Sequence, residues 1–187
     1  MSYLQENLEL LESCYPGIRK EVLSEYIPSL ELEIIETEEE TDLGNTALRS
    51  RAPGPTVRYK AKYLHSKRNP RREAVRVVSQ SIPEQPACCV FLGLGLGYHI
   101  EEFHRRYPDS EVIIVEPDIP LFLALLEVRN FSEVFNGINV NLLLAADAGA
   151  LLPLLEPFRG NDIAIIRLRS VYEKDQEYYQ EIERIIS

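Results

Sequence analysis

The chain has 187 residues, which is room for one full domain or for one domain with a small appendage. Its hydrophobic content of 45% and charged content of 27% are ordinary for a soluble globular chain. The formal net charge of -10 argues against nucleic-acid binding. No stretch reaches the roughly 20 apolar residues that span a bilayer, and the first residues do not resemble a signal peptide. We therefore expect a cytoplasmic protein without a membrane partner.

The first third of the chain predicts a small antiparallel unit with helices in front of it. Leu4, Leu8 and Leu11 share one face of a helix expected over residues 3–14, and a second short helix is expected over residues 18–26. Alternating apolar and polar residues predict three strands. The first begins at Ser29, the second covers residues 43–51 and the third covers residues 57–64, and an acidic loop is expected at 36–42. We therefore predict two domains, a small α+β unit over residues 1–63 and a larger unit over residues 64–187.

A basic segment joins these two predicted units. Asn69 is expected to cap a helix whose first residue is Pro70 and whose core face carries Val75 and Val78. The cations of the segment are Arg58, Lys60, Lys62, Lys67, Arg68, Arg71, Arg72 and Arg76. Such a segment beside a helix N-terminus suits a phosphate-bearing ligand or an acidic partner, and the alternative is a solvated face that balances the acidic loop.

Residues 88–118 form the stretch around which the rest is organised. An apolar run ends in Gly93-Leu94-Gly95-Leu96-Gly97, a helical pattern begins at Tyr98, and a second apolar run ends on Glu116. This order predicts a strand, a glycine turn, a helix and a second strand, as in Rossmann-like nucleotide sites. A glycine turn lets the backbone approach a ligand, the helix start offers free amides to an anion, and an acid about 20 residues further on commonly holds a ribose hydroxyl.

The turn departs from both common fingerprints of cofactor sites. A dinucleotide site wants a third glycine where Tyr98 stands. Methyltransferases that use S-adenosylmethionine resemble the turn, but they usually carry an acid just before the first glycine, where this chain has Phe91 and Leu92. The cofactor therefore stays open between a nucleotide and S-adenosylmethionine, and the alternative is that the glycines only allow close packing of the helix on the strand.

Two further strands are expected after the glycine region. They cover residues 140–144 and 163–168, and helices are expected to open at Pro120 and to cover 148–156 and 171–186. Alternating strands and helices of this kind form a mostly parallel sheet, so the predicted fold class is Rossmann-like α/β. The carboxyl edge of this sheet would collect the predicted cofactor-binding residues Gly93, Gly95, Gly97, Tyr98, His99, Glu116 and Asp147. His99 has a structural alternative, and Asp147 could instead cap the next helix. The sequence does not identify the catalytic residues, which stay unknown.

The three cysteines do not indicate a disulfide framework. Cys14 stands alone, and Cys88 and Cys89 are neighbours in a predicted core strand, so we expect buried reduced thiols. A metal site is not expected, because adjacent strand residues point to opposite faces and the histidines lack ligand-like spacing.

Two motifs carry a family resemblance. The stretch from Tyr63 to Ala74 (YLHSKRNPRREA), and the turn GLGLGYH followed by EPD at 116–118, resemble the N-terminal region of the motility accessory factor family. In that family the first motif reads LHSKY-P-EA, so Arg68 replaces the usual tyrosine. The resemblance covers about residues 55–135.

This resemblance implies a function and partners. Members of the family are large bacterial proteins implicated in attaching sialic-acid-like sugars to flagellin, and their sugar-transfer domain lies downstream of this region. No segment of this chain matches that domain, so the resemblance implies an accessory module that works with a glycosyltransferase domain or the flagellin-modification machinery. The alternative function is a free-standing methyltransferase or another nucleotide-binding enzyme.

Overall fold

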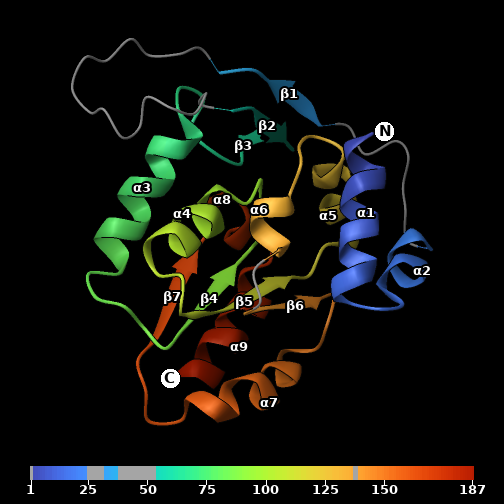
Figure 1. Ribbon diagram of the computed structural model, residues 1–187. Coiled ribbons are helices and arrows are strands. Elements are labelled where there is room, and N and C mark those ends of the chain that lie inside the picture. The colour runs from blue at the N-terminus through green and yellow to red at the C-terminus, as the bar shows by residue number, and fades with distance from the viewer. Residues whose placement is uncertain (1, 25–31, 38–53, 137–138) are drawn as a thin grey trace.

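A computed structural model describes residues 2–24, 32–37, 54–136 and 139–187 (Figure 1). The strands are β1 (Glu33–Ile35), β2 (Thr56–Tyr59), β3 (Lys62–Tyr63), β4 (Cys88–Leu92), β5 (Glu111–Glu116), β6 (Val140–Leu144) and β7 (Ile163–Arg167). The α-helices are α1 (Tyr3–Cys14), α2 (Ile18–Leu23), α3 (Pro70–Ser81), α4 (Tyr98–Arg106), α5 (Ile119–Leu126), α6 (Ser132–Phe135), α7 (Leu152–Leu155), α8 (Arg169–Tyr172) and α9 (Gln176–Ile186). Two 3-10 turns, η1 (Ala148–Leu151) and η2 (Glu156–Phe158), flank α7.

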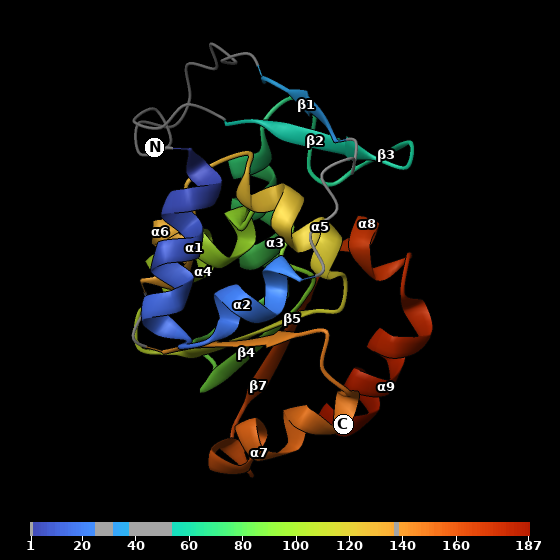
Figure 2. The ribbon, with the colours of Figure 1, turned by 90° about the vertical axis from the view of Figure 1, so that its right-hand side faces the viewer.

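The core is a four-stranded parallel sheet with the order β6-β5-β4-β7. Its central strands β4 and β5 are apolar and are buried along almost their whole length, as expected of parallel strands that are covered on both faces. Helices α1, α3, α4, α5 and α6 lie on one side of the sheet, and α7 and α9 lie on the other side (Figures 1 and 2). The predicted Rossmann-like α/β fold is therefore confirmed.

A separate antiparallel sheet has the order β1-β2-β3, which confirms the predicted small antiparallel unit. The prediction of one strand over residues 57–64 was wrong, because a two-residue hairpin at Lys60 and Ala61 splits it. Both residues have positive φ angles, 46° and 64°, which is the geometry of the tight turns that join antiparallel strands. Residues 29–31 and 43–51 of the other two predicted strands lie outside the described residues, as does 38–42 of the predicted acidic loop.

Most predicted helices are confirmed, and two are broken. Asn69 caps α3 by accepting a hydrogen bond from the Arg72 amide at 2.8 Å, with Pro70 as the first helical residue. The helix predicted over 148–156 is instead a succession of η1, α7 and η2, because Pro153 and Pro157 lack the amide hydrogen that continues a helix. The helix predicted over 171–186 is interrupted between α8 and α9.

Helix α1 is tied to the layer of helices on the parallel sheet. The Asn7 side chain is 1% exposed, donates to the carbonyls of Leu126 and Arg129 at 2.8 Å each, and accepts from the Phe131 amide at 2.8 Å. The first helix thus shares its polar contacts with residues that follow α5. The domain boundary at residues 63 and 64 stays a prediction. Within the described ranges, every helix is too short or too polar to cross a membrane.

Candidate functional site

The predicted turn connects β4 to α4 through three glycines. Gly93, Gly95 and Gly97 have φ angles of +98°, +52° and +76°, a region in which a side chain is strained. Gly97 precedes the first residue of α4, Tyr98, and its carbonyl accepts the amide of Ile100. The local sequence therefore folds as the pattern predicts, with a turn at the carboxyl end of the first strand of the parallel sheet.

The turn is closely packed by side chains from distant parts of the chain. A methyl group added to Gly95 would lie 2.4 Å from Leu168 Cδ2 and 2.7 Å from His65 Nε2. One added to Gly93 would lie 3.0 Å from Val171, and one added to Gly97 would lie 2.6 Å from Val134. Each glycine is thus needed for close packing, which was the alternative to a ligand-binding turn.

Glu116 lies at the end of β5 and faces the turn. It is fully buried, and its two carboxylate oxygens accept the amides of Leu94 and Asp118, both at 3.1 Å. Burial raises the pKa of Glu116 to about 7, and the two amide hydrogen bonds oppose that rise. The carboxyl group that was predicted to hold a ribose hydroxyl therefore joins the turn after β4 to the start of α5.

His65 takes a second amide of the turn. Its Nε2 accepts the Leu96 amide at 2.9 Å, so the hydrogen of the neutral ring is on Nδ1. That Nδ1 is buried and has no hydrogen-bond partner among the described residues, and the closest carboxylate oxygen, Oε2 of Glu73, is 3.8 Å away. Burial lowers the pKa of His65 despite the attraction of Glu73, so the ring is neutral.

His99 stacks on His65 with 5.5 Å between the ring centroids. It is 8% exposed, and burial together with the neighbouring His65 lowers the pKa of His99 to about 3. Both imidazoles are therefore neutral at physiological pH, and neither carries the positive charge that would attract an anion.

Tyr98 is held between two guanidinium groups. Its hydroxyl donates to the Pro55 carbonyl at 2.7 Å, and the guanidinium carbons of Arg129 and Arg71 lie 4.5 Å and 5.2 Å from its ring centroid. Both arginines also pair with the buried carboxylate of Glu101. This network links Pro55, just before β2, to α3, α4 and the segment after α5, so Tyr98 has a structural role where the fingerprint of a dinucleotide site would require a glycine.

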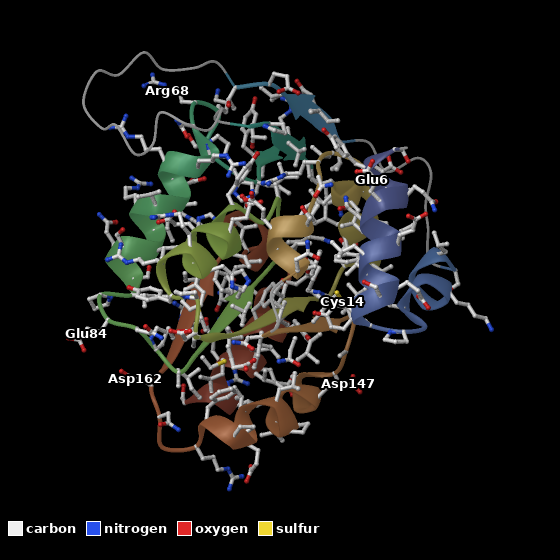
Figure 3. The ribbon with its side chains drawn as sticks, viewed as in Figure 1. Glu6, Cys14, Arg68, Glu84, Asp147 and Asp162 are labelled. Carbon is white, nitrogen blue, oxygen red and sulfur yellow. The ribbon has the colours of Figure 1, made fainter. Side chains whose placement is uncertain are left out.

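Asp147 lies apart from the turn. It is exposed, it follows β6, and β6 is separated from β4 by β5. Its side chain makes no capping hydrogen bond to η1, and Figure 3 shows it at the outer side of the molecule beyond β6. A cofactor-binding role for Gly93, Gly95, Gly97, Tyr98, His99, Glu116 and Asp147 stays a prediction.

A pocket of about 500 Å³ opens at the end of β7, and its lining includes His65 and Leu168, which pack against Gly95 of the turn. Its lining comes from the segment that begins at β3, from α3 and α4, and from the residues at and after the end of β7. The polar lining side chains are Lys62, Tyr63, His65, Ser66, Lys67, Glu73, His99, Arg167, Arg169, Ser170 and Glu173. Another pocket, of about 590 Å³, is lined by residues that follow β5, β6 and α8, including Asp118, Ala145 and Lys174.

The predicted basic segment does not form one surface. Arg58 pairs with Glu33 at 2.5 Å and Arg71 pairs with buried Glu101 at 2.8 Å, whereas Lys62 and Lys67 line the pocket. The sequence did not indicate that Arg169 and Glu173 join these two lysines, because about a hundred residues separate them and contacts between the two segments, such as that of Ser170 with the Leu64 carbonyl, form in the fold.

Comparisons with known proteins gave a family match, a sequence relative and a solved structure of the same fold. Residues 47–147 match the sequence profile described as the Glycosyltransferase Maf N-terminal domain. An uncharacterized protein of Treponema pallidum (strain Nichols) is 34% identical over 103 residues, which are 54% of this chain and 35% of that protein. The solved structure of the Maf glycosyltransferase from Magnetospirillum magneticum AMB-1 matches 98% of this chain with a TM-score of 0.56 and 14% identity. That match supports the fold alone, and the chain corresponds to 35% of the length of the solved protein.

Proposed function

Because the chain belongs to the family of Maf glycosyltransferase N-terminal domains, we propose that it is a non-catalytic accessory module of a flagellin-glycosylation protein. In this role it works in the cytoplasm with a glycosyltransferase part, which carries out the sugar transfer. The family match covers the glycine turn, the capped helix α3 and the strand that ends on Glu116, and these are the features that the structure packs together.

The accessory role is supported mainly by the side chains that pack against the glycine turn and accept its amides. The amides of Leu94 and Leu96 donate to Glu116 and His65, and Leu168 packs against Gly95. In a Rossmann-like enzyme, amides at this position hold the phosphates or the carboxylate of the cofactor. Here the chain's own side chains take that place, which favours a module with a structural or docking role over a methyltransferase.

The test measures flagellin glycosylation in cells of the source organism. The coding sequence of residues 1–187 is removed in frame, and the intact mass of flagellin is compared before and after removal and after complementation. We expect the sugar mass to disappear on removal and to return with the intact chain. The Arg159→Ala variant, which changes an exposed cation paired with Glu156, is the matched control and should complement fully.

Two results would overturn the proposal. Flagellin that keeps its full sugar mass without residues 1–187 would show that the module is not needed. Sugar transfer to flagellin by the purified 187-residue chain alone, with activated sugar as donor, would show that the chain is itself a transferase.

A further inference from the structure

The pocket beside the turn lies where Rossmann-like folds bind ligands. The strand order is β6-β5-β4-β7. After β4 the chain adds β5 and then β6 on one side of β4, and it returns to add β7 on the other side. The crevice between β4 and β7 is therefore the switch point of the sheet. His65 and Leu168 fill the part of this crevice next to Gly95. His65 and Leu168 also line the pocket of about 500 Å³, whose volume is in the usual range for small-molecule sites.

Cations line the outer part of this pocket in a chain whose net charge is -10. Lys62 and Arg169 share the carboxylate of Glu173, at 2.7 Å and 2.9 Å, and the Lys67 ammonium lies 5.0 Å from the Tyr63 ring centroid. The Lys62 and Arg169 side chains are 55% and 91% exposed, and ion pairs with such exposure contribute little. These cations can therefore turn to a phosphate, which would form charge-assisted hydrogen bonds with them.

Glu73 supplies hydrogen-bond acceptors on the inner wall. Its side chain is 27% exposed, and its Oε2 accepts the Ser66 amide at 2.8 Å. Burial alone would raise the pKa of Glu73, but the neighbouring His65 and the hydrogen bond from the Ser66 amide outweigh it and the pKa is lowered, so the group is ionised at neutral pH. An ionised carboxylate accepts hydrogen bonds, so it can hold the hydroxyls of a sugar.

The buried donor behind Glu73 also favours a hydroxyl. His65 Nδ1 lacks an acceptor among the described residues and is 3.8 Å from Glu73 Oε2, which is too long for a hydrogen bond. When the Glu73 carboxylate rotates toward a ligand, a hydroxyl oxygen can accept from this Nδ1 and donate to the carboxylate. A hydroxyl is the group that satisfies both partners, because it donates and accepts.

We propose that this pocket binds a small phosphorylated polyol, a sugar phosphate or a nucleotide, with Glu73 accepting from its hydroxyls and Lys62, Lys67 and Arg169 facing its phosphate. This site is distinct from the glycine turn, and it does not depend on the proposed role in glycosylation.

Calorimetric titration of the 187-residue chain tests the proposal with four probes: ribose 5-phosphate, ribose, inorganic phosphate and uridine monophosphate. Ribose 5-phosphate should bind at least tenfold more tightly than inorganic phosphate, and ribose should bind too weakly to measure. Tighter binding of uridine monophosphate than of ribose 5-phosphate identifies a nucleotide as the ligand, and the opposite order identifies a sugar phosphate.

Variants separate the two parts of the site. Glu73→Gln should weaken ribose 5-phosphate about tenfold and leave inorganic phosphate unchanged, whereas Lys67→Ala should weaken both about tenfold. Arg159→Ala removes a cation outside the pocket and should change neither. Circular dichroism melting checks that each variant folds. Because Lys67 is exposed, we expect Lys67→Ala to fold, and it still tests the site if Glu73→Gln does not fold.

The proposal fails if no probe binds, or if inorganic phosphate binds as tightly as ribose 5-phosphate, which would indicate a general anion patch. It also fails if folded Glu73→Gln keeps the full preference for ribose 5-phosphate.

Discussion

Glu116 and His65 show how single polar side chains stabilise a turn made of glycines. Each is buried, and each accepts a backbone amide of the turn, from Leu94 and from Leu96. An unpaired amide in such surroundings would cost roughly 1–3 kcal/mol, so the two side chains offset a cost that the turn itself creates.

The raised pKa of Glu116 gives the protein a defined pH dependence. Its ordinary pKa is 4.5 and its folded pKa is about 7, so the folded state binds the proton more tightly than the unfolded state. The contribution of this group to the free energy of unfolding is therefore highest below pH 4.5, falls as the pH rises through 7, and is constant above about pH 8, with a total loss of about 3 kcal/mol.

Urea unfolding at several pH values between 4 and 8 checks this prediction. The Glu116→Gln variant cannot ionise there, so the difference in free energy of unfolding between the variant and the original chain should change by about 3 kcal/mol across this range. Asp147→Asn removes an exposed carboxylate and is the control. A difference that does not vary with pH for Glu116→Gln would contradict the raised pKa.

At the scale of elements, close packing fixes the turn between β4 and α4. Gly95→Ala should lose the free energy of the left-handed conformation, about 1–2 kcal/mol, and a further 1–3 kcal/mol from overlap with His65 and Leu168. Gly160 also has a positive φ, +81°, but an added Cβ there would have no atom within 4 Å. Gly160→Ala should therefore lose only the free energy of the left-handed conformation. Thermal or urea unfolding measures both, and equal losses would show that the turn has room for a side chain.

A second element-scale feature is the ion pair network that holds α4 to α3. The Glu101 side chain is 4% exposed and pairs with Arg71 and Arg129, which are 25% and 13% exposed. Glu101→Gln leaves two partly buried cations without their carboxylate and should destabilise the chain by about 3 kcal/mol.

An exposed pair provides the comparison for this prediction. Glu156 and Arg159 are 59% and 78% exposed, so Glu156→Gln should change the free energy of unfolding by less than about 0.5 kcal/mol. Similar losses for Glu101→Gln and Glu156→Gln in urea unfolding would mean that burial of the network does not matter.

The sequence predicted helices, strands and turns well where a few neighbouring residues determine the local geometry. The cap at Asn69, the glycine turn and the strands that end at Leu92, Glu116 and Leu144 follow from residues that are close in sequence. The hairpin at Lys60 and Ala61 was missed because neither residue is a usual one for positive φ. The contacts of His65 with Leu96 were also missed, since they connect residues 31 apart and depend on the packing of two segments.

At the scale of the whole molecule, the residues before and after position 63 share contacts that a domain boundary there would separate. Asn7 contacts the segment after α5. Thr56 donates to the His65 carbonyl, and the Tyr98 hydroxyl donates to the Pro55 carbonyl. We therefore expect one cooperative transition in calorimetry, with equal calorimetric and van't Hoff enthalpies. Asn7→Ala should lower the temperature of that single transition, whereas two separate transitions would support independent units.

The pocket could not be predicted as a unit, because its lining comes from three distant parts of the chain. The sequence showed the cations of residues 58–76 as one group, but the fold sends Arg71 to a buried pair and leaves Lys62 and Lys67 beside Arg169. These side chains come together where the residues after β7 contact the segment after β3, as in the hydrogen bond from Ser170 to the Leu64 carbonyl.

The position of Glu116 also has a consequence for motion. One carboxylate holds the connection after β4 through Leu94 and the connection after β5 through Asp118. Neither connection can open while that carboxylate keeps both of its bonds. After a sudden change in pH, the two connections should therefore relax together at a shared rate. A movement that starts at α5 would reach α4 without passing through β5, the strand between them.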